Sequence, residues 1–165
     1  MNKYKDNKSL IPEQYMRLAI RQALAGVAKG QTPFGALIVF EGKVVACTHN
    51  QVWKRTDITA HAEILALRQA CRKLQRLHLA GAALYSTCEP CPMCFSAIHW
   101  ARITKIFFGA SIEHAAAFGF NELKISNQQM AKLGDMKLEL HPGILQDECK
   151  AIFQTWKSIQ QNKAY

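Results

Sequence analysis

The sequence of 165 residues has no uninterrupted apolar stretch near the ~18 residues that a membrane helix requires, which excludes an integral membrane protein built from such helices. It has only 9 Gly and 5 Pro, and 49% of its residues are hydrophobic, so collagen-like, low-complexity and intrinsically disordered chains are excluded as well. No internal repeat, linker or change of composition divides the chain. We therefore expect one globular domain over residues 1–165, large enough to bury a core without disulfides.

Residues 1–9 lack the apolar region of a secretory signal peptide, and we therefore expect a cytoplasmic protein. In a reducing compartment, the 6 Cys of the chain indicate a metal site or catalysis before they indicate disulfides. Three of them, Cys47, Cys71 and Cys149, fall on predicted buried faces and are interpreted as core residues.

Acidic residues are few: 12 Asp and Glu stand against 21 Lys and Arg, a formal net charge of +9. An excess of this size attracts nucleic acid, anionic substrates or acidic partners. The clearest local concentration is Arg68, Arg72 and Arg76, at the i, i+4, i+8 spacing of one helix face, beside Lys73. A solvated helix face is the simpler interpretation of this stripe, and an RNA-binding surface is the alternative.

Hydrophobic periodicity and turn signals predict helices that alternate with short strands. Helices are expected over residues 12–29, about 60–76, 92–100 and about 145–160, and strands over 35–40, 43–48, 82–87, 104–109 and, less regularly, 137–140. Residues 111–135 have the least regular pattern. The alternation predicts an α/β layered fold with one sheet covered by helices, and the hairpin over residues 35–48 makes that sheet mixed.

Two short motifs at predicted helix starts carry groups that can perform chemistry. His61-Ala62-Glu63 opens the second helix, and Pro90-Cys91-Pro92-Met93-Cys94 opens the third. One imidazole and two thiolates suit tetrahedral Zn²⁺, and a helix N-terminus favours thiolate. Three protein ligands, His61, Cys91 and Cys94, leave the fourth position to a water molecule whose pKa zinc lowers toward ~7. Glu63 lies near the metal without having to bind it, so its carboxylate can move the proton.

An alternative stays open at this metal site. Cys88 precedes Cys91 by three residues, and a closed site of one His and three Cys would be structural, with no position for water. Against that alternative, the combination of His-x-Glu with Pro-Cys-x-x-Cys is the signature of zinc deaminases that act on nucleobases. A closed site would also leave Glu63 without a role.

Residues 33–36, Asn50, residues 59–63 and residues 88–94 together resemble the cytidine-deaminase superfamily, and with the flanking elements the likeness covers most of the chain. The resemblance implies a three-layer α/β/α sandwich around a five-stranded mixed sheet. It also implies one zinc ion per subunit and hydrolytic loss of an amino group as ammonia.

Two branches of that superfamily compete. Residues 98–102, 118–122 and 153–165 resemble bacterial guanine deaminase, a homodimer that exchanges its C-terminal segment, here about residues 145–165. This resemblance implies that Glu122 assists proton transfer and that Tyr165 contacts the partner's site. Residues 60–70 and 143–149 instead resemble the tRNA adenosine deaminases, which the basic charge also favours.

We interpret the chain as a deaminase that converts guanine, a small-molecule purine, to xanthine and ammonia. The alternatives are a tRNA-specific deaminase that converts adenosine to inosine, a cytosine or cytidine deaminase, and a non-catalytic zinc-stabilised domain. tRNA would be a partner only in the first of these.

Five residues are candidates for substrate binding, each with a plainer alternative. Phe34 could stack on the base or pack in the core, and Asn50 could pair with the heterocycle edge or form an Asx turn. The backbone of Ala62 can donate to a ring carbonyl. Trp100 is expected to wall the pocket, with helix packing as its alternative, and Tyr165 is assigned by the resemblance.

Overall fold

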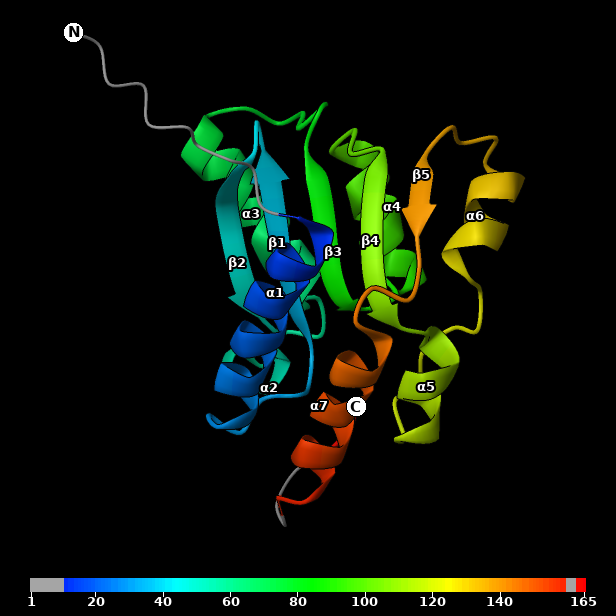
Figure 1. The fold of residues 1–165 in the computed structure, drawn as a ribbon. Helices are drawn as coiled ribbons and strands as arrows, with labels where there is room; N and C mark the ends of the chain where they lie inside the picture. Colours follow the sequence, from blue (N-terminus) through cyan, green and yellow to red (C-terminus); the bar gives the residue numbers. More distant parts are fainter. Residues whose placement is uncertain (1–10, 160–162) are drawn as a thin grey trace, which may run out of the picture.

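The computed structural model describes residues 11–159 and 163–165 (Figure 1). Its helices are α1 (Pro12–Val27), α2 (Val52–Arg55), α3 (Ala62–Leu74), α4 (Pro92–Trp100), α5 (Ile112–Ala117), α6 (Asn127–Leu133) and α7 (Gln146–Lys157). Its strands are β1 (Gly35–Phe40), β2 (Lys43–His49), β3 (Ala83–Cys88), β4 (Lys105–Ala110) and β5 (Glu139–His141). None of the helices in the described residues combines the length and hydropathy of a membrane span.

The strands form one five-stranded sheet in the order β2-β1-β3-β4-β5, which confirms the predicted mixed sheet. β1 runs antiparallel to both β2 and β3, and β3, β4 and β5 run parallel to one another. The strand directions determine where the segments after β2 and β3 begin. Because β2 and β3 flank the antiparallel β1, they share one direction, and their carboxyl ends meet at the same edge of the sheet. The segments that lead into α3 and α4 both start from that edge.

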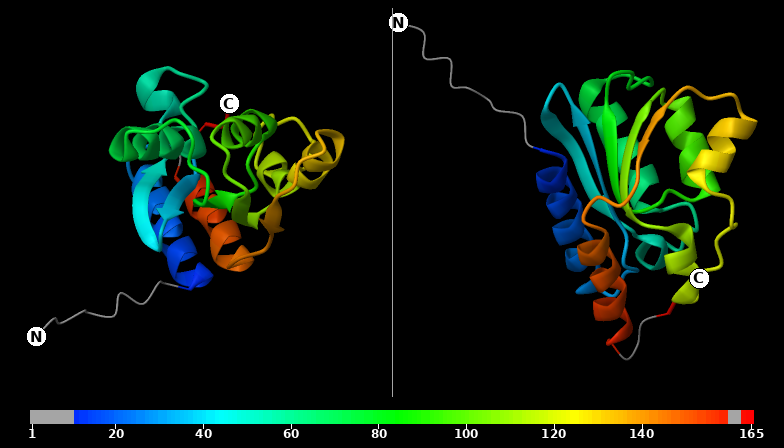
Figure 2. Two further views of the ribbon diagram at one scale, coloured as in Figure 1. Left: turned by 90° about the horizontal axis from the view of Figure 1, so that it is seen from above. Right: turned by 45° about the vertical axis from the view of Figure 1, so that its right-hand side comes forward.

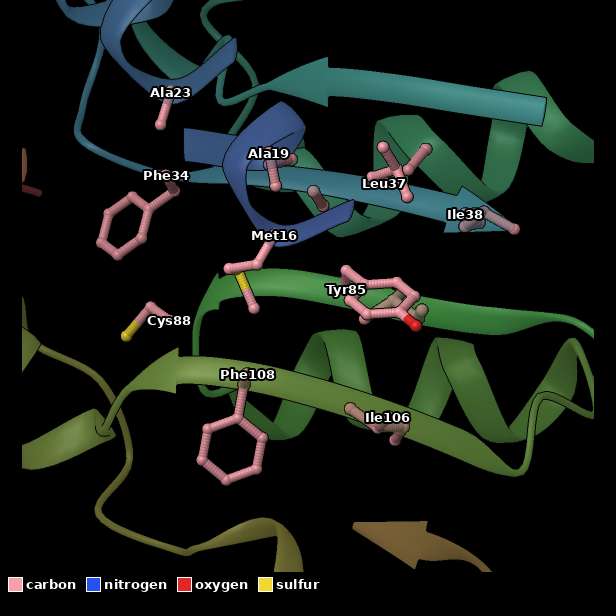
Figure 3. Packing of buried hydrophobic residues seen from close by; sticks show 14 of the residues in the cluster. Met16, Ala19, Ala23, Phe34, Leu37, Ile38, Tyr85, Cys88, Ile106 and Phe108 are labelled. Atoms are coloured by element: carbon pink, nitrogen blue, oxygen red, sulfur yellow. The ribbon is translucent and has the colours of Figure 1, made fainter. Parts of the chain in front are cut away.

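Helices cover both faces of the sheet, as the predicted α/β/α sandwich requires. α1 and α7 pack on one face and against each other, whereas α3 and α4 contact each other on the opposite face (Figures 1 and 2). Between α1 and the sheet, Met16 lies with Leu37, Tyr85 and Ile106 in the central apolar cluster (Figure 3). The His61 and Cys91 motifs stand at the starts of α3 and α4, so they lie on this second face, next to the edge where β2 and β3 end.

Two glycines let the helices approach the sheet closely. A Cβ atom at Gly35 would overlap the backbone carbonyl oxygen of Ala19 in α1, and a Cβ atom at Gly109 would overlap Sγ of Cys149 in α7. Glycine is therefore required at both positions by space. The buried Cys149 confirms one of the three expected core cysteines, whereas Cys47 and Cys71 are only partly buried.

The elements that the periodicity misses are short. α2, α5 and α6 have 4, 6 and 7 residues, too few for an apolar period to emerge. α5 and α6 instead begin at local caps: Ser111 accepts from the backbone N–H of His114, and Ser126 forms a capping box with Gln129. α3 begins at Ala62, two residues after the predicted start, because His61 is its extended N-cap residue.

Candidate metal centre and active site

Three side chains from two helix starts converge at the carboxyl edge of the sheet. His61 is the N-cap residue of α3, Cys91 is the N-cap residue of α4, and Cys94 lies in the first turn of α4. Their donor atoms all lie within 4.8 Å of one another, and no other described His, Cys, Asp or Glu joins this group. The predicted ligand set is therefore brought together as the sequence motifs indicate.

The spacing of the donors fits a tetrahedral zinc ion. Sγ of Cys91 lies 3.7 Å and Sγ of Cys94 lies 3.5 Å from Nδ1 of His61. Bonds of about 2.3 Å to sulfur and about 2.0 Å to nitrogen place the two ligand atoms of a tetrahedral ion about 3.5 Å apart. One imidazole and two thiols are also the donor set that zinc prefers, so the residues present fit this metal.

The fourth cysteine of the motif region lies outside the cluster. Cys88 is 1% exposed, and its side chain points into the apolar core (Figure 3). Its thiol donates to the backbone carbonyl of Ser111 at 3.4 Å, and burial raises its pKa well above the usual range. A closed site of one His and three Cys does not match this arrangement.

Hydrogen bonding and burial shift the pKa values of Cys91 and Cys94 in opposite directions. The hydrogen bond from Cys94 lowers the pKa of Cys91 to about 4, and contact with His61 acts in the same direction against the effect of burial. The same hydrogen bond and burial raise the pKa of Cys94. The pair therefore loses its first proton readily, and the binding of a metal releases the remaining one.

Glu63 lies beside the donors but outside the group that they form. The side chain is 5% exposed, Ser86 donates to its Oε1 at 2.9 Å, and Cys94 contacts its Oε2 at 3.6 Å. Burial raises the pKa of this carboxyl above its ordinary value. One oxygen is fixed by a hydroxyl of β3 and the other faces the thiols, which is the placement that a proton-transfer group needs.

A cavity of about 320 Å³ opens over the donor cluster. Its wall includes Glu122, whose Oε2 is buried and has no hydrogen-bond partner among the described residues. Burial, together with the negative charges of Cys91 and Glu63, raises the pKa of Glu122 to about 8. The cavity is lined by Ile58, His61, Cys91, Pro92, Met93, Phe120, Asn121, Glu122, Leu123 and Tyr165.

Tyr165 enters this cavity from the C-terminal segment of its own chain. Its ring centroid lies 5.7 Å from that of His61, and its hydroxyl accepts a hydrogen bond of 2.6 Å from Nδ2 of Asn50. Asn50 is fully buried, and its Oδ1 accepts from the N–H of Val52, so the plainer Asx interpretation of Asn50 also holds. Contact of Tyr165 with a partner's site stays a prediction.

Two of the expected substrate contacts lie elsewhere. Phe34 is 6% exposed and packs edge-on against Phe120 and Phe153, so it occupies the core role that was its alternative. Trp100 is 79% exposed and does not line the cavity over the cluster, so the single chain does not bring it to the site. It follows the buried Ile98 by two residues, which is ~200° around the helix and turns it to solvent.

Ala62 sits where its predicted role is possible. It is the first residue of α3, and the N–H groups of a first helical turn have no intrahelical acceptor. Thr48 fixes the peptide by donating to the Ala62 carbonyl at 2.6 Å. Donation from this N–H to a substrate stays a prediction.

Sequence reasoning missed Glu89, which organises the wall of the cavity. Glu89 is 7% exposed; its Oε1 accepts from the N–H of Asn127 at 2.8 Å and its Oε2 from the N–H of Ile112 at 3.4 Å. Asn127 also donates to the carbonyl of Pro90 at 2.6 Å. One carboxylate thus caps the first residues of α5 and α6, which bracket the segment that carries Glu122. No local signal could have shown this, because the partners lie 23 and 38 residues away.

The comparisons with known proteins agree with this geometry. Residues 11–110 match the family model of the cytidine and deoxycytidylate deaminase zinc-binding region. The chain is 36% identical to guanine deaminase of Bacillus subtilis over 93% of this chain and 98% of that protein. It is also 36% identical to the tRNA-specific adenosine deaminase of the same organism, over 83% of each chain.

A solved structure of guanine deaminase from Nitrosomonas europaea superimposes on the chain with a TM-score of 0.82, at 29% identity, over 90% of this chain and 85% of that one. The chain is thus similar both to guanine deaminases and to a tRNA-specific adenosine deaminase.

Proposed function

The chain belongs to the cytidine and deoxycytidylate deaminase family, and on that premise we propose that it converts guanine and water to xanthine and ammonia. The observation that carries the proposal is the cavity over the metal cluster, whose wall combines Glu122 and Tyr165. A volume of about 320 Å³ suits a single base. One relative that matches almost end to end is a guanine deaminase, which supports the same substrate.

His61, Cys91 and Cys94 would hold the metal, one zinc ion per subunit. Zinc in such a site supplies a nucleophilic water molecule near neutral pH. Glu63 would take one proton from the water that attacks C2 of guanine and pass it to a ring nitrogen. It would then take the second proton from the hydroxyl added at C2 and give it to the amine, so that the C2–N bond breaks and ammonia leaves. Its raised pKa suits it to hold that proton between the two transfers.

Glu122 and Tyr165 would bind the base. Burial raises the pKa of Glu122 and so favours its protonated form, which can donate to the purine or to the departing amine. Its partnerless oxygen supplies the unused hydrogen-bonding capacity that a ligand would take up. Tyr165, held by Asn50, closes the side of the cavity next to His61.

A tRNA-specific adenosine deaminase is the second candidate. The matching tRNA enzyme of Bacillus subtilis and the net charge of +9 both favour it. Ammonia release should be measured on guanine, guanosine, adenine, cytosine, cytidine and a tRNA anticodon stem-loop. We expect guanine to be preferred by at least about 100-fold in kcat/KM. Preference for the stem-loop would replace our proposal by the alternative, and silence on all substrates with metal bound would indicate a non-catalytic domain.

Glu63→Ala separates chemistry from metal binding. The variant should keep its metal and lose about 10³-fold or more in turnover, because general acid–base groups contribute about 10²–10⁴-fold. Glu113→Ala, at an exposed glutamate of α5, is the matched control and should leave turnover unchanged. Full activity in Glu63→Ala would contradict the assignment.

We also propose that the protein is a cytoplasmic homodimer and that about residues 145–165 are exchanged between its subunits. The contacts of α7 and Tyr165 described above within one chain would then form with the partner. The resemblance to guanine deaminase supports the dimer and the exchange, and light scattering of the purified chain tests the oligomeric state.

A further inference from the structure

A second concave surface lies at the β2 edge of the sheet, outside the metal site, and its charge is of one sign. This basic groove has a volume of about 700 Å³ and is formed by residues of α1, β2, α2, α3 and the segment before α2. Its lining consists of Gln22, Cys47, Thr48, Gln51, Arg55, Leu65, Arg68, Gln69, Arg72 and Lys73. Among these described residues there are four cations, no acid and no aromatic ring.

The cations of the groove come from more than one element. Arg68, Arg72 and Lys73 lie on α3, and Arg55 reaches the groove from α2, where its Nε donates to Gln51 at 2.7 Å. Arg76, the third member of the arginine stripe, lies instead with its guanidinium 5.2 Å from the ring centroid of Phe40. Two of the three arginines of the stripe therefore line the groove, and Arg55 joins them from another helix.

These charges are not neutralised within the described part of the chain. All four cations are exposed, and none belongs to an ion pair within 4.0 Å among the described residues. Hydrogen bonds from Thr59 and, more weakly, the charges of Arg68 and Arg55 lower the pKa of Asp57, but Asp57 does not line the groove.

A solvated helix face would look different. Such a face alternates acidic and basic residues at i, i+4, which stabilises the helix, whereas like charges at that spacing destabilise it by similar amounts. Arg68 and Arg72 face each other at i, i+4, and the only acid of α3 is the buried Glu63. The helix thus carries an unfavourable arrangement that an anionic ligand would relieve.

We propose that the basic groove binds the phosphodiester backbone of a single-stranded nucleic acid. Guanidinium groups bind phosphate oxygens bidentately, and the amide of Gln22 can add neutral hydrogen bonds. The lining contains no aromatic side chain on which a base could stack, so binding is independent of base sequence. The four cations come from two helices, and those of α3 span more than one turn, which suits a chain of phosphates better than one phosphate. This inference does not rest on the identity of the deaminated base.

Fluorescence anisotropy with the full metal-loaded protein tests the proposal, using labelled 15-nucleotide homopolymers of uridine and of adenosine. The test variant is Arg68→Gln/Arg72→Gln, which keeps good helix formers and leaves α2 unchanged. The control Lys43→Gln/Lys132→Gln removes the same charge at two exposed lysines outside the groove. Both variants should deaminate the free base at the unmutated rate.

Each lost phosphate contact flattens the slope of log K against log salt by about 0.7 for a single strand. The arginine variant should therefore bind both homopolymers about 25-fold more weakly at 0.1 M salt, with a slope shallower by about 1.4, while the control changes little. Equal weakening in test and control would overturn the groove as the site. Tripolyphosphate that competes at equal phosphate concentration, with no gain for the longer RNA, would overturn the nucleic-acid ligand.

Discussion

Replacing Glu89 by Ala should destabilise the protein by about 3 kcal/mol while leaving the metal donors in place. The side chain accepts two buried backbone hydrogen bonds, at 2.8 Å from Asn127 and 3.4 Å from Ile112. A hydrogen bond to a charged group contributes about 1.5–3 kcal/mol, and the longer bond belongs at the weak end. Relief of the burial that raises the pKa of Glu89 offsets part of the loss.

Thermal unfolding followed by circular dichroism measures this effect. For a chain of this size, about 3 kcal/mol corresponds to a fall in Tm of about 6–12 °C. Glu89→Gln keeps one oxygen, which can still accept from the N–H of Asn127, but it has no second oxygen to accept from the N–H of Ile112. Its fall in Tm should therefore be about half as large. An unchanged Tm in Glu89→Ala, or equal losses in both variants, would refute the capping role.

Activity gives a second readout that simple loss of stability does not move. Because α5 and α6 hold the segment with Glu122, we expect Glu89→Ala, assayed well below its Tm, to raise KM more than it lowers kcat. Metal content should stay at the unmutated level, and Glu89→Gln should recover most of the KM. Loss of metal in proportion to loss of activity would instead assign Glu89 to support of the cysteine motif.

Three further outcomes follow from the geometry. Cys91→Ser should lose most of the bound metal and Cys88→Ser should keep it, as measured by atomic absorption; equal loss would contradict the separation of Cys88 from the cluster. Burial lowers the pKa of His49 below 6.5, so the unfolded chain binds more protons, and stability present above pH 6.5 is lost as pH falls through the folded pKa. Urea unfolding at pH 7.5 and at pH 5.5 should therefore differ less in His49→Gln than in the unmutated protein, and equal differences would exclude His49 as the cause. Gly109→Ala should cost about 1–3 kcal/mol through overlap with Cys149, and Cys149→Ala should recover part of that loss; additive losses would argue against the contact.

The metal site could be predicted because its determinants are local. The motifs of His61, Cys91 and Cys94 each stand at a helix start, and two strands of like direction bring those starts to one edge. The helices and strands with a clear period were found within a few residues of their ends. Short helices were missed, although the capping pattern that begins at Ser126 was readable.

The pocket wall could not be predicted from residue patterns, because it depends on contacts between distant segments. Asn50 and Tyr165 bond across 115 residues, and Glu89 caps helices that pattern analysis had not identified. The resemblance to guanine deaminase supplied Glu122 and Tyr165, but it could not show their surroundings. Trp100 was expected to wall the pocket, but its position on α4 leaves it 79% exposed.

The short helix α2 stands between the two concave surfaces of this molecule. The indole of Trp53 donates to the backbone carbonyl of Lys163 and its ring packs near Tyr165, whereas Arg55 lines the basic groove. A helix of 4 residues is a single turn and has too little length to bend, so it moves as one piece. A substitution at Trp53 is therefore expected to displace Arg55 as well, and a substitution at Arg55 to displace Trp53. Variants at these two residues should be designed together.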